Sequence, residues 1–109
     1  MILRGNIYYV SNHTTTGSEQ CGRRPAVIVS NNAGNATSKT VEIVYLTTKP
    51  KTDLPTHVVV RSAPQPSTAL CEQVTCVSTD RLEEFVGACT AQEMERINYA
   101  LRISLDLNI

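Results

Sequence analysis

The stretch TVEIVYLT, residues 40–47, has the period-two pattern of a β-strand. Val41, Ile43 and Tyr45 would lie on one face of the strand, and Val44 on the other. Patterns of this period dominate the first four-fifths of the chain, and the remainder changes to a helical spacing. The sequence therefore predicts a mainly β (α+β) fold that ends in a helix.

Four further segments share the pattern and are expected to be strands: residues 6–11, 25–30, 56–61 and 69–78. Segment 25–30, PAVIVS, is apolar on both faces, which is typical of a central strand or one that lies against a partner. Turn-rich segments separate the strands at 31–39, 49–55 and 62–68. Five short strands at this spacing predict a small barrel or a sandwich.

The end of the chain predicts one amphipathic helix over about residues 91–105. Thr90 and Glu93 fit a capping box, in which each side chain satisfies a backbone N–H of the first turn. Apolar residues then recur at helical spacing at Met94, Ile97, Leu101 and Leu105. We expect this stripe to pack into the core, and we also expect a shorter helix around residues 79–85.

The composition indicates one globular domain over residues 1–109. The chain has 10 basic and 10 acidic residues, so its total charge does not indicate a partner bound mainly by charge. Its start lacks the apolar run of a signal peptide, and no stretch is long enough to span a membrane. We therefore expect a cytoplasmic protein with no membrane contact.

The chain has four cysteines: Cys21, Cys71, Cys76 and Cys89. None of them forms a C-x2-C pair, and the two histidines are isolated from one another. In a reducing compartment such cysteines are expected to be structural thiols rather than disulfides. The sequence predicts no metal site and no cofactor.

The stretch GSEQCGRRP, residues 17–25, places one carboxylate and two guanidinium groups at the mouth of a predicted strand. Pro25 biases Arg24 toward an extended conformation, so its guanidinium would project from a rigid base. A guanidinium stays charged and matches the oxygens of a phosphate in a two-pronged way. From the residues alone, an anion site and a solvated turn with surface ion pairs between Glu19 and Arg23 or Arg24 both remain open.

Two other groups of polar residues stand near strand ends. Thr47 and Thr48 close the predicted strand and precede Lys49 and Lys51, an arrangement that would suit a phosphodiester but does not require one. Glu72 interrupts an apolar segment, where an unpaired carboxylate is costly to bury. We expect Glu72 to be exposed or paired, with an arginine of the 17–25 stretch as a candidate partner.

Taken together, five blocks resemble the MazF/PemK (Kid-like) toxins of bacterial type II toxin–antitoxin systems. In chain order these blocks are RGNIYYV (4–10), GSEQCGRRPAVIVSNNAGN (17–35), LPTHVVV (54–60), LCEQV (70–74) and MERINYALRISLDL (94–107). The resemblance implies an SH3-like small β-barrel of the CcdB/MazF type with a C-terminal helix, assembled as a homodimer. It also implies a ribosome-independent and metal-independent endoribonuclease that cuts single-stranded RNA at short recognition sequences.

The resemblance carries site residues over position by position. It places the family's essential arginine at Arg24, its catalytic threonine at Thr47, its loop glutamate at Glu19 and, approximately, the acidic base of the Kid branch at Glu72. Candidate RNA contacts are His13, Ser18, Gln20, Arg23, Thr48, Lys49 and Lys51. The chain departs from the family pattern at Thr75 and Ser78, which stand where relatives have Arg and Asp, and at Cys21, where many have a small residue.

The implied reaction is attack of a ribose 2′-hydroxyl on the adjacent phosphorus, which leaves a 2′,3′-cyclic phosphate and a 5′-hydroxyl. Arg24 would hold the phosphate and Thr47 would hydrogen-bond it, with Glu19 or else Glu72 as general base. A cognate antitoxin with a disordered acidic tail would compete for the arginines and lysines. The alternatives are a CcdB-like toxin that binds DNA gyrase without cutting, and an inactive regulatory relative.

Overall fold

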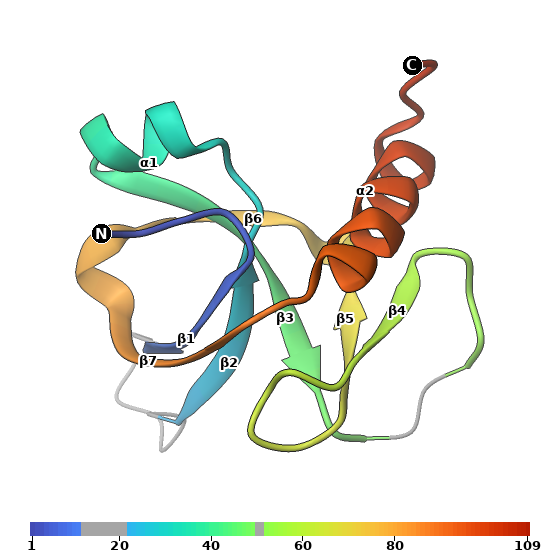
Figure 1. Ribbon diagram of the computed structural model, residues 1–109, viewed down its shortest axis with the longest axis horizontal. Helices are drawn as coiled ribbons and strands as arrows, with labels where there is room; N and C mark the ends of the chain where they lie inside the picture. The colour runs from blue at the N-terminus through green and yellow to red at the C-terminus, as the bar shows by residue number, and fades with distance from the viewer. Residues whose placement is uncertain (12–21, 50–51) are drawn as a thin grey trace.

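The computed structural model describes residues 1–11, 22–49 and 52–109. Its strands are β1 (Asn6–Ser11), β2 (Arg23–Ile28), β3 (Thr40–Thr47), β4 (His57–Val60), β5 (Ser67–Leu70), β6 (Thr75–Ser78) and β7 (Leu82–Ala88). Between and after them lie α1 (Asn32–Thr37), the 3₁₀ turns η1 (Cys71–Gln73) and η2 (Thr79–Arg81), and α2 (Ala91–Leu105). Figure 1 shows the long strand β3 in the middle of this arrangement.

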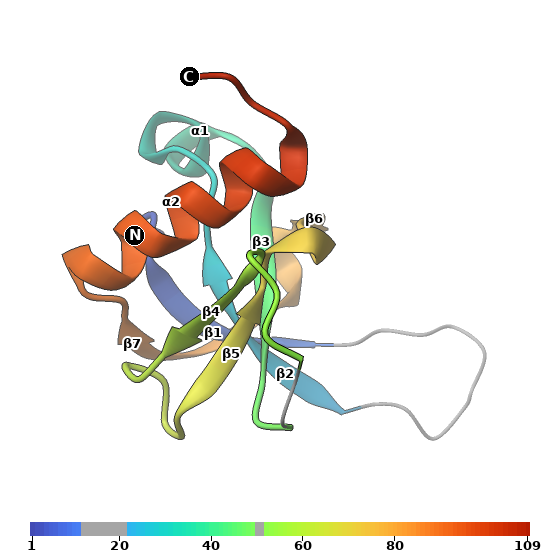
Figure 2. The same ribbon diagram turned by 90° about the vertical axis from the view of Figure 1, so that its right-hand side faces the viewer.

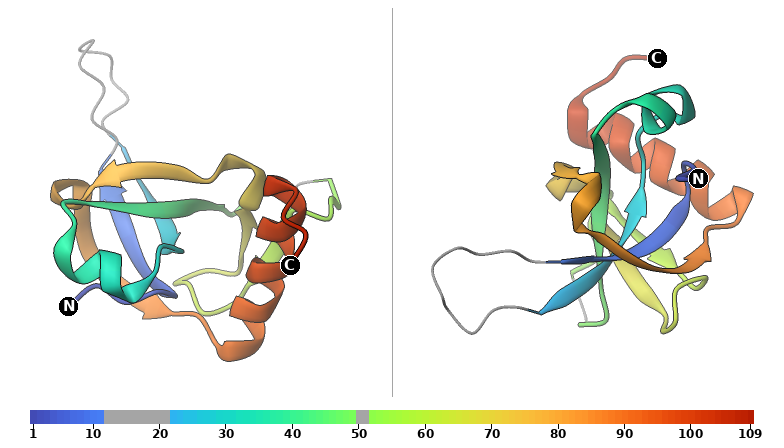
Figure 3. Two further views of the ribbon diagram at one scale, coloured as in Figure 1. Left: turned by 90° about the horizontal axis from the view of Figure 1, so that it is seen from above. Right: turned by 90° about the vertical axis from the view of Figure 1, so that its left-hand side faces the viewer.

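The strands form one antiparallel sheet in the order β4-β5-β3-β2-β1-β7, with β6 also paired to β3. Figure 3 shows the sheet curving round a common interior, so that it has the shape of a barrel although its edges at β4 and β7 stay open. Helix α2 contacts β4 and η1, and Figure 2 shows it lying across this side of the sheet. The prediction of a small β-barrel with a C-terminal helix is confirmed.

Strand β3 faces two apolar clusters, as its alternating sequence predicts. Val44 and Leu46 belong to the larger cluster, which Ile97 of α2 closes. On the opposite face Ile43 belongs to a smaller cluster, against which the ring of Tyr45 packs. The observed bounds Thr40–Thr47 match the prediction, because both faces of this strand are needed to form the core.

The prediction of one strand over residues 69–78 is wrong. Moving three residues back along β3, from Leu46 to Ile43, moves the paired residue six forward, from Ala69 to Thr75. The three extra residues leave the sheet as η1, Cys71–Gln73, so β5 and β6 follow one another along the same edge of β3. Periodicity alone does not reveal this break, because residues on either side of it keep an apolar pattern.

The predicted helix around residues 79–85 forms only as the three residues of η2, and the prediction is wrong for the residues that follow. After the three residues of η2, which Ser78 caps, the chain extends into β7 and pairs with β1. The pairing aligns Tyr8 with Phe85, and their rings meet edge to face with centroids 5.6 Å apart. Tertiary pairing therefore outweighs the local helical preference of this segment.

Helix α1 forms inside the segment 31–39, where only turns were predicted. The Asn31 side chain caps it by accepting a hydrogen bond from the Gly34 backbone N–H at 2.7 Å. The buried Asn35 side chain donates to the Ser30 backbone carbonyl at 3.0 Å. Polar side-chain contacts, rather than helix propensity, thus hold this short helix.

Helix α2 has the predicted bounds and the predicted capping box between Thr90 and Glu93. Ile97 is fully buried and Met94 and Leu101 pack against the core, but Leu105 is 51% exposed, so the apolar stripe is buried only in part. Among the described residues, no helix is long and apolar enough to cross a membrane. Two strands differ slightly from their predicted bounds. β2 spans Arg23–Ile28 where 25–30 was predicted, and β4 spans His57–Val60 where 56–61 was predicted.

Candidate functional site

The start of β2, the end of β3 and the connection between β4 and β5 meet at one end of the barrel (Figure 1). This end carries Arg24 as the second residue of β2 and Thr47 as the last residue of β3. Thr48 and Lys49 follow directly. Arg23 and Glu72 are also described, whereas five further residues predicted for this site lie outside the described part of the chain: His13, Ser18, Glu19, Gln20 and Lys51.

Arg24 lies over the ring of Tyr45, with its guanidinium carbon 4.5 Å from the ring centroid. Ala26 is paired with Tyr45, so the side chain of Arg24, two residues earlier on β2, projects to the same face as Tyr45 and Thr47. This alternation places the predicted phosphate ligand and the predicted catalytic threonine on one face of the sheet. Within the described part of the chain, no carboxylate lies within salt-bridge distance of Arg24.

A second arginine reaches the same tyrosine from η2. The Arg81 Nη2 atom donates to the Tyr45 hydroxyl at 3.4 Å, and its Nε atom donates to the Ser11 backbone carbonyl at 2.8 Å. Tyr45 therefore has one guanidinium over its ring and another at its hydroxyl. Sequence reasoning did not single out either Tyr45 or Arg81, because their contacts depend on strand register and on a turn 36 residues away along the chain.

Arg23 has different surroundings, although it is adjacent to Arg24. Its guanidinium lies 3.4 Å from a carboxylate oxygen of Glu83 and 3.6 Å from one of Glu84, both on β7. It also lies over the ring of Tyr9, 4.3 Å from the centroid. Arg23 thus forms surface ion pairs across the sheet, whereas Arg24 has an aromatic ring as its described contact.

Thr47 lies at the end of β3, where the strand pairs with Thr68 of β5. Its Oγ1 atom accepts a hydrogen bond from the Lys49 backbone N–H at 3.2 Å, so the side chain oxygen is held at the turn that leaves the strand. The hydroxyl hydrogen of Thr47 is not used in this bond. It remains able to donate to an anion placed at the same face.

Glu72 forms a separate polar cluster on η1. It accepts from Thr56 Oγ1 at 2.9 Å and lies 3.0 Å from His57 Nε2, so its partner is His57 rather than Arg23 or Arg24. Burial alone would raise the pKa of Glu72, but hydrogen bonds from its own backbone, His57 and Thr56, with the charge of His57, together lower it. The structure therefore does not bring this second candidate base to Arg24.

A cavity of about 190 Å³ opens beside the strand ends. Its lining includes Tyr9, Pro25, Thr48, Pro64, Gln65 and Ser67. Pro25 and Thr48 follow Arg24 and Thr47 in the chain, so this cavity faces the opposite side of the strands from those two residues. The strand ends thus have a charged face and, next to it, a small hollow with an aromatic wall.

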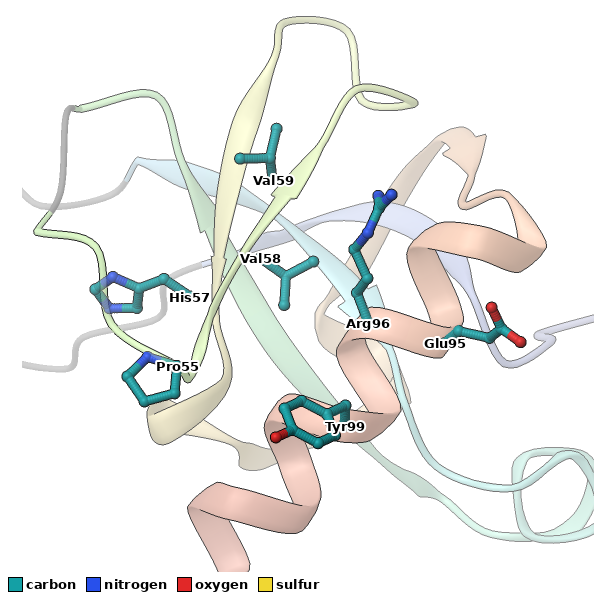
Figure 4. A pocket seen from close by; sticks show the side chains of 7 residues that line it. All are labelled: Pro55, His57, Val58, Val59, Glu95, Arg96 and Tyr99. Carbon is teal, nitrogen blue, oxygen red and sulfur yellow. The ribbon is translucent and has the colours of Figure 1, made fainter.

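A second cavity, of about 510 Å³, lies between β4 and α2 (Figure 4). Val58 and Val59 line it from the strand, and Tyr99 and Arg96 line it from the helix. Val59 and Tyr99 are 53% and 60% exposed, so apolar surface is open to water here. Neither Arg24 nor Thr47 lines this cavity.

The described cysteines are buried or isolated from one another. Cys71, Cys76 and Cys89 are free thiols. Burial, assisted by the charge of Glu72 in the first case and Glu93 in the second, raises the pKa of Cys71 and that of Cys89 to about 12. Residues 1–11, 22–49 and 52–109 contain no group of three or more His, Cys, Asp or Glu side chains that could hold a metal ion.

Comparison with known proteins gives one consistent family. The family model described as "PemK-like, MazF-like toxin of type II toxin-antitoxin system" matches residues 3–105. The protein Endoribonuclease MazF of Staphylococcus saprophyticus is 34% identical over 113 residues, which cover 99% of this chain and 94% of that protein.

Solved structures agree with the family model. An endoribonuclease in complex with its cognate antitoxin, from a mycobacterial species, is 32% identical and has a TM-score of 0.84, covering 100% of this chain and 99% of that chain. A MazE–MazF structure from Deinococcus radiodurans has a TM-score of 0.86 at 20% identity, covering 98% and 97% of the two chains. The second likeness concerns the fold, whereas the first extends to sequence.

Proposed function

The chain belongs to the PemK-like, MazF-like toxins of type II toxin–antitoxin systems, and on this premise we propose that it is an endoribonuclease that cleaves single-stranded RNA at short recognition sequences. The observation that supports this best is the placement of Arg24 and Thr47 on one face at neighbouring strand ends. A permanently charged guanidinium next to a hydroxyl donor suits one phosphodiester.

The proposed reaction needs no external nucleophile. The ribose 2′-oxygen forms a bond to phosphorus, the bond from phosphorus to the 5′-oxygen breaks, and the products are a 2′,3′-cyclic phosphate and a 5′-hydroxyl. Arg24 binds the non-bridging phosphate oxygens and stabilises the charge that accumulates on them in the transition state. Thr47 donates its hydroxyl to the same phosphate and fixes the line of attack.

Two protons move in this reaction, one from the 2′-hydroxyl and one to the departing 5′-oxygen. We assign the first transfer to Glu19, which lies outside the described residues. Glu72 is the weaker candidate because it is bonded to His57 and Thr56, and a lowered pKa makes a carboxylate a poorer proton acceptor. Arg24 would stabilise the charge on the 5′-oxygen as it leaves, and a proton from water would complete the 5′-hydroxyl.

The remaining candidate residues would bind RNA without taking part in the chemistry. Lys49 and Lys51 would contact phosphates, which adds affinity but no sequence information. We propose that Ser18 and Gln20, in the 17–25 stretch, and His13, which precedes it, also contact the RNA. Arg23 would contribute less than Arg24, since Glu83 and Glu84 already neutralise much of its charge.

We further propose that the protein acts in the cytoplasm as a homodimer and is neutralised by a cognate antitoxin with an acidic tail. The exposed Val59 and Tyr99 beside the larger cavity support a partner surface, because a monomer leaves them in water. The mycobacterial relative in complex with its antitoxin supports the second part. The arginines and lysines at the strand ends would attract an acidic tail.

Incubation of the purified protein with a defined single-stranded RNA, with and without EDTA, tests the function. We expect fragments with 2′,3′-cyclic phosphate and 5′-hydroxyl ends, formed at the same sites in EDTA because Arg24 supplies the positive charge. RNA left intact under these conditions would overturn the proposal and favour a gyrase-binding toxin or an inactive relative. Loss of cleavage in EDTA alone would refute the metal-free mechanism.

A further inference from the structure

The small cavity at the strand ends has the size and wall chemistry of a site for one flat ring system. Its volume of about 190 Å³ is below the roughly 300 Å³ at which pockets for drug-sized ligands begin. Tyr9 and Pro25 supply flat, largely apolar surfaces, while Gln65 and Thr48 supply polar groups. A flat apolar wall with a few hydrogen-bonding groups is how proteins hold an unstacked RNA base.

The aromatic wall is held in place before any ligand binds. The Arg23 guanidinium lies 4.3 Å from the centroid of the Tyr9 ring and is itself tied to Glu83 and Glu84. Tyr9 is also paired with Pro25 in the register of β1 with β2. A ring fixed in this way gives the cavity an aromatic wall at little further cost in conformational entropy.

The polar side of the cavity is a turn whose backbone is fixed. The hydroxyl of the buried Ser67 donates to the Gln65 backbone carbonyl at 2.8 Å. The Gln65 side chain is exposed, and its amide offers both donors and an acceptor. An amide of this kind distinguishes bases by the donor and acceptor pattern of their edges.

Two residues that line the cavity are adjacent in the chain to the two residues assigned to the phosphate. Pro25 follows Arg24 and Thr48 follows Thr47, so the cavity and the charged face share the rim where both strands end. The mode of binding inferred below has a nucleotide with its phosphate at Arg24 and its base turned over this rim. Phosphate contacts set the position of the RNA, and base contacts at such a site set the sequence.

We propose that this cavity is a nucleobase pocket, in which a base next to the scissile phosphate lies against Tyr9 and Pro25 and presents its edge to Gln65. Gln65 is then a determinant of the cleavage sequence, and not a catalytic residue. This inference rests on the proposed function, because it assumes that RNA is bound at Arg24.

Cleavage of a random-sequence RNA pool by the full chain, followed by sequencing of the fragment ends, tests the pocket. For Gln65→Ala we expect the preference at one position beside the cut to fall by roughly 5-fold or more, with other positions unchanged. Gln65→Glu, which removes the amide donors, should change the base preferred at that position. Gln92→Ala, the same truncation at an exposed glutamine on α2, is the matched control and should keep the wild-type profile.

The possible outcomes separate this inference from the function. If the wild-type protein cuts with a defined sequence preference and both Gln65 variants keep it, the pocket is refuted and the endoribonuclease stands. A uniform loss of preference at all positions would also refute it. If the wild-type protein does not cut RNA, both proposals fail. Should Gln65→Ala fail to fold by thermal melting, Gln65→Asn, which withdraws the amide by one methylene, provides the same comparison.

Discussion

The ring of Tyr45 beneath Arg24 gives a sharp test of how the candidate site is organised. The guanidinium carbon of Arg24 lies 4.5 Å from the ring centroid, and Tyr45 also accepts from Arg81 through its hydroxyl. Tyr45→Leu removes the ring but keeps an apolar side chain against the smaller cluster. Tyr45→Phe keeps the ring and removes only the hydroxyl.

A guanidinium over an aromatic ring gains about 0.5–1 kcal/mol at exposed sites and about 2 kcal/mol where water is excluded. If the ring holds Arg24 in the orientation that the transition state needs, its loss raises the barrier by that amount. At 1.36 kcal/mol for each tenfold change in rate, we expect Tyr45→Leu to lower kcat by about 2- to 30-fold. The hydroxyl contact at 3.4 Å is long, so Tyr45→Phe should stay within about 2-fold of wild type.

The assay is cleavage of one short RNA under multiple-turnover conditions, with kcat and KM measured separately and thermal melting as the check on folding. A lower kcat in Tyr45→Leu and its recovery in Tyr45→Phe identify the ring as a positioning group. A wild-type kcat in Tyr45→Leu would show that Arg24 does not depend on the ring. An equal loss in both variants would assign the effect to the hydroxyl and Arg81.

Three further predictions concern stability and thiol chemistry. Burial alone would raise the pKa of Glu93, but hydrogen bonds from the Ser62 side chain and from nearby backbone N–H groups lower that pKa. The Glu93 carboxylate therefore stabilises the fold fully above the pKa of the unfolded chain, near 4.5, and this stabilisation is lost as the pH falls through the lower pKa of the native state. Glu93→Gln should therefore lower the free energy of unfolding in urea by about 1–3 kcal/mol at pH 7, and its difference from wild type should narrow below pH 4.5. A difference that is constant with pH would contradict this. Exposed Cys76 should react with iodoacetamide well before buried Cys71 and half-buried Cys89, whose pKa values are raised to about 12, and peptide mass spectrometry showing equal rates would refute the burial. Gly87→Ala should destabilise the fold by about 1–3 kcal/mol, because the added Cβ would lie 2.6 Å from the backbone carbonyl oxygen of Ser62, which follows β4. An unchanged melting temperature would contradict that contact.

Elements that depend on a long local pattern could be predicted from the sequence. The strand 40–47 and the helix 91–105 have the expected bounds, since apolar alternation and a capping box are local properties. The break at η1 could not be predicted, because it arises from a three-residue change of register along β3. Likewise β7 forms through pairing with β1, a contact that no local rule contains.

The candidate site divides in the same way. Arg24 and Thr47 could be named from sequence, because Pro25 and a strand end are visible there and the family blocks mark them. Tyr45 and Arg81 could not, since the contact between them spans two different elements. Glu72 is paired, as one of the two predicted alternatives, but its partner is His57 and not the candidate arginine, because the pairing of β4 with β5 brings His57 to it.

The central claim is that Arg24, and not its neighbour, holds the scissile phosphate, and the rates of RNA cleavage by Arg24→Ala and Arg23→Ala compare the two directly. Both substitutions remove one guanidinium from adjacent positions of β2, so they change the net charge equally. We expect Arg24→Ala to lower kcat by about 100-fold or more and Arg23→Ala to lower it by less than about 10-fold, since only the first removes transition-state stabilisation. A wild-type rate in Arg24→Ala, or equal losses in the two variants, would contradict the account.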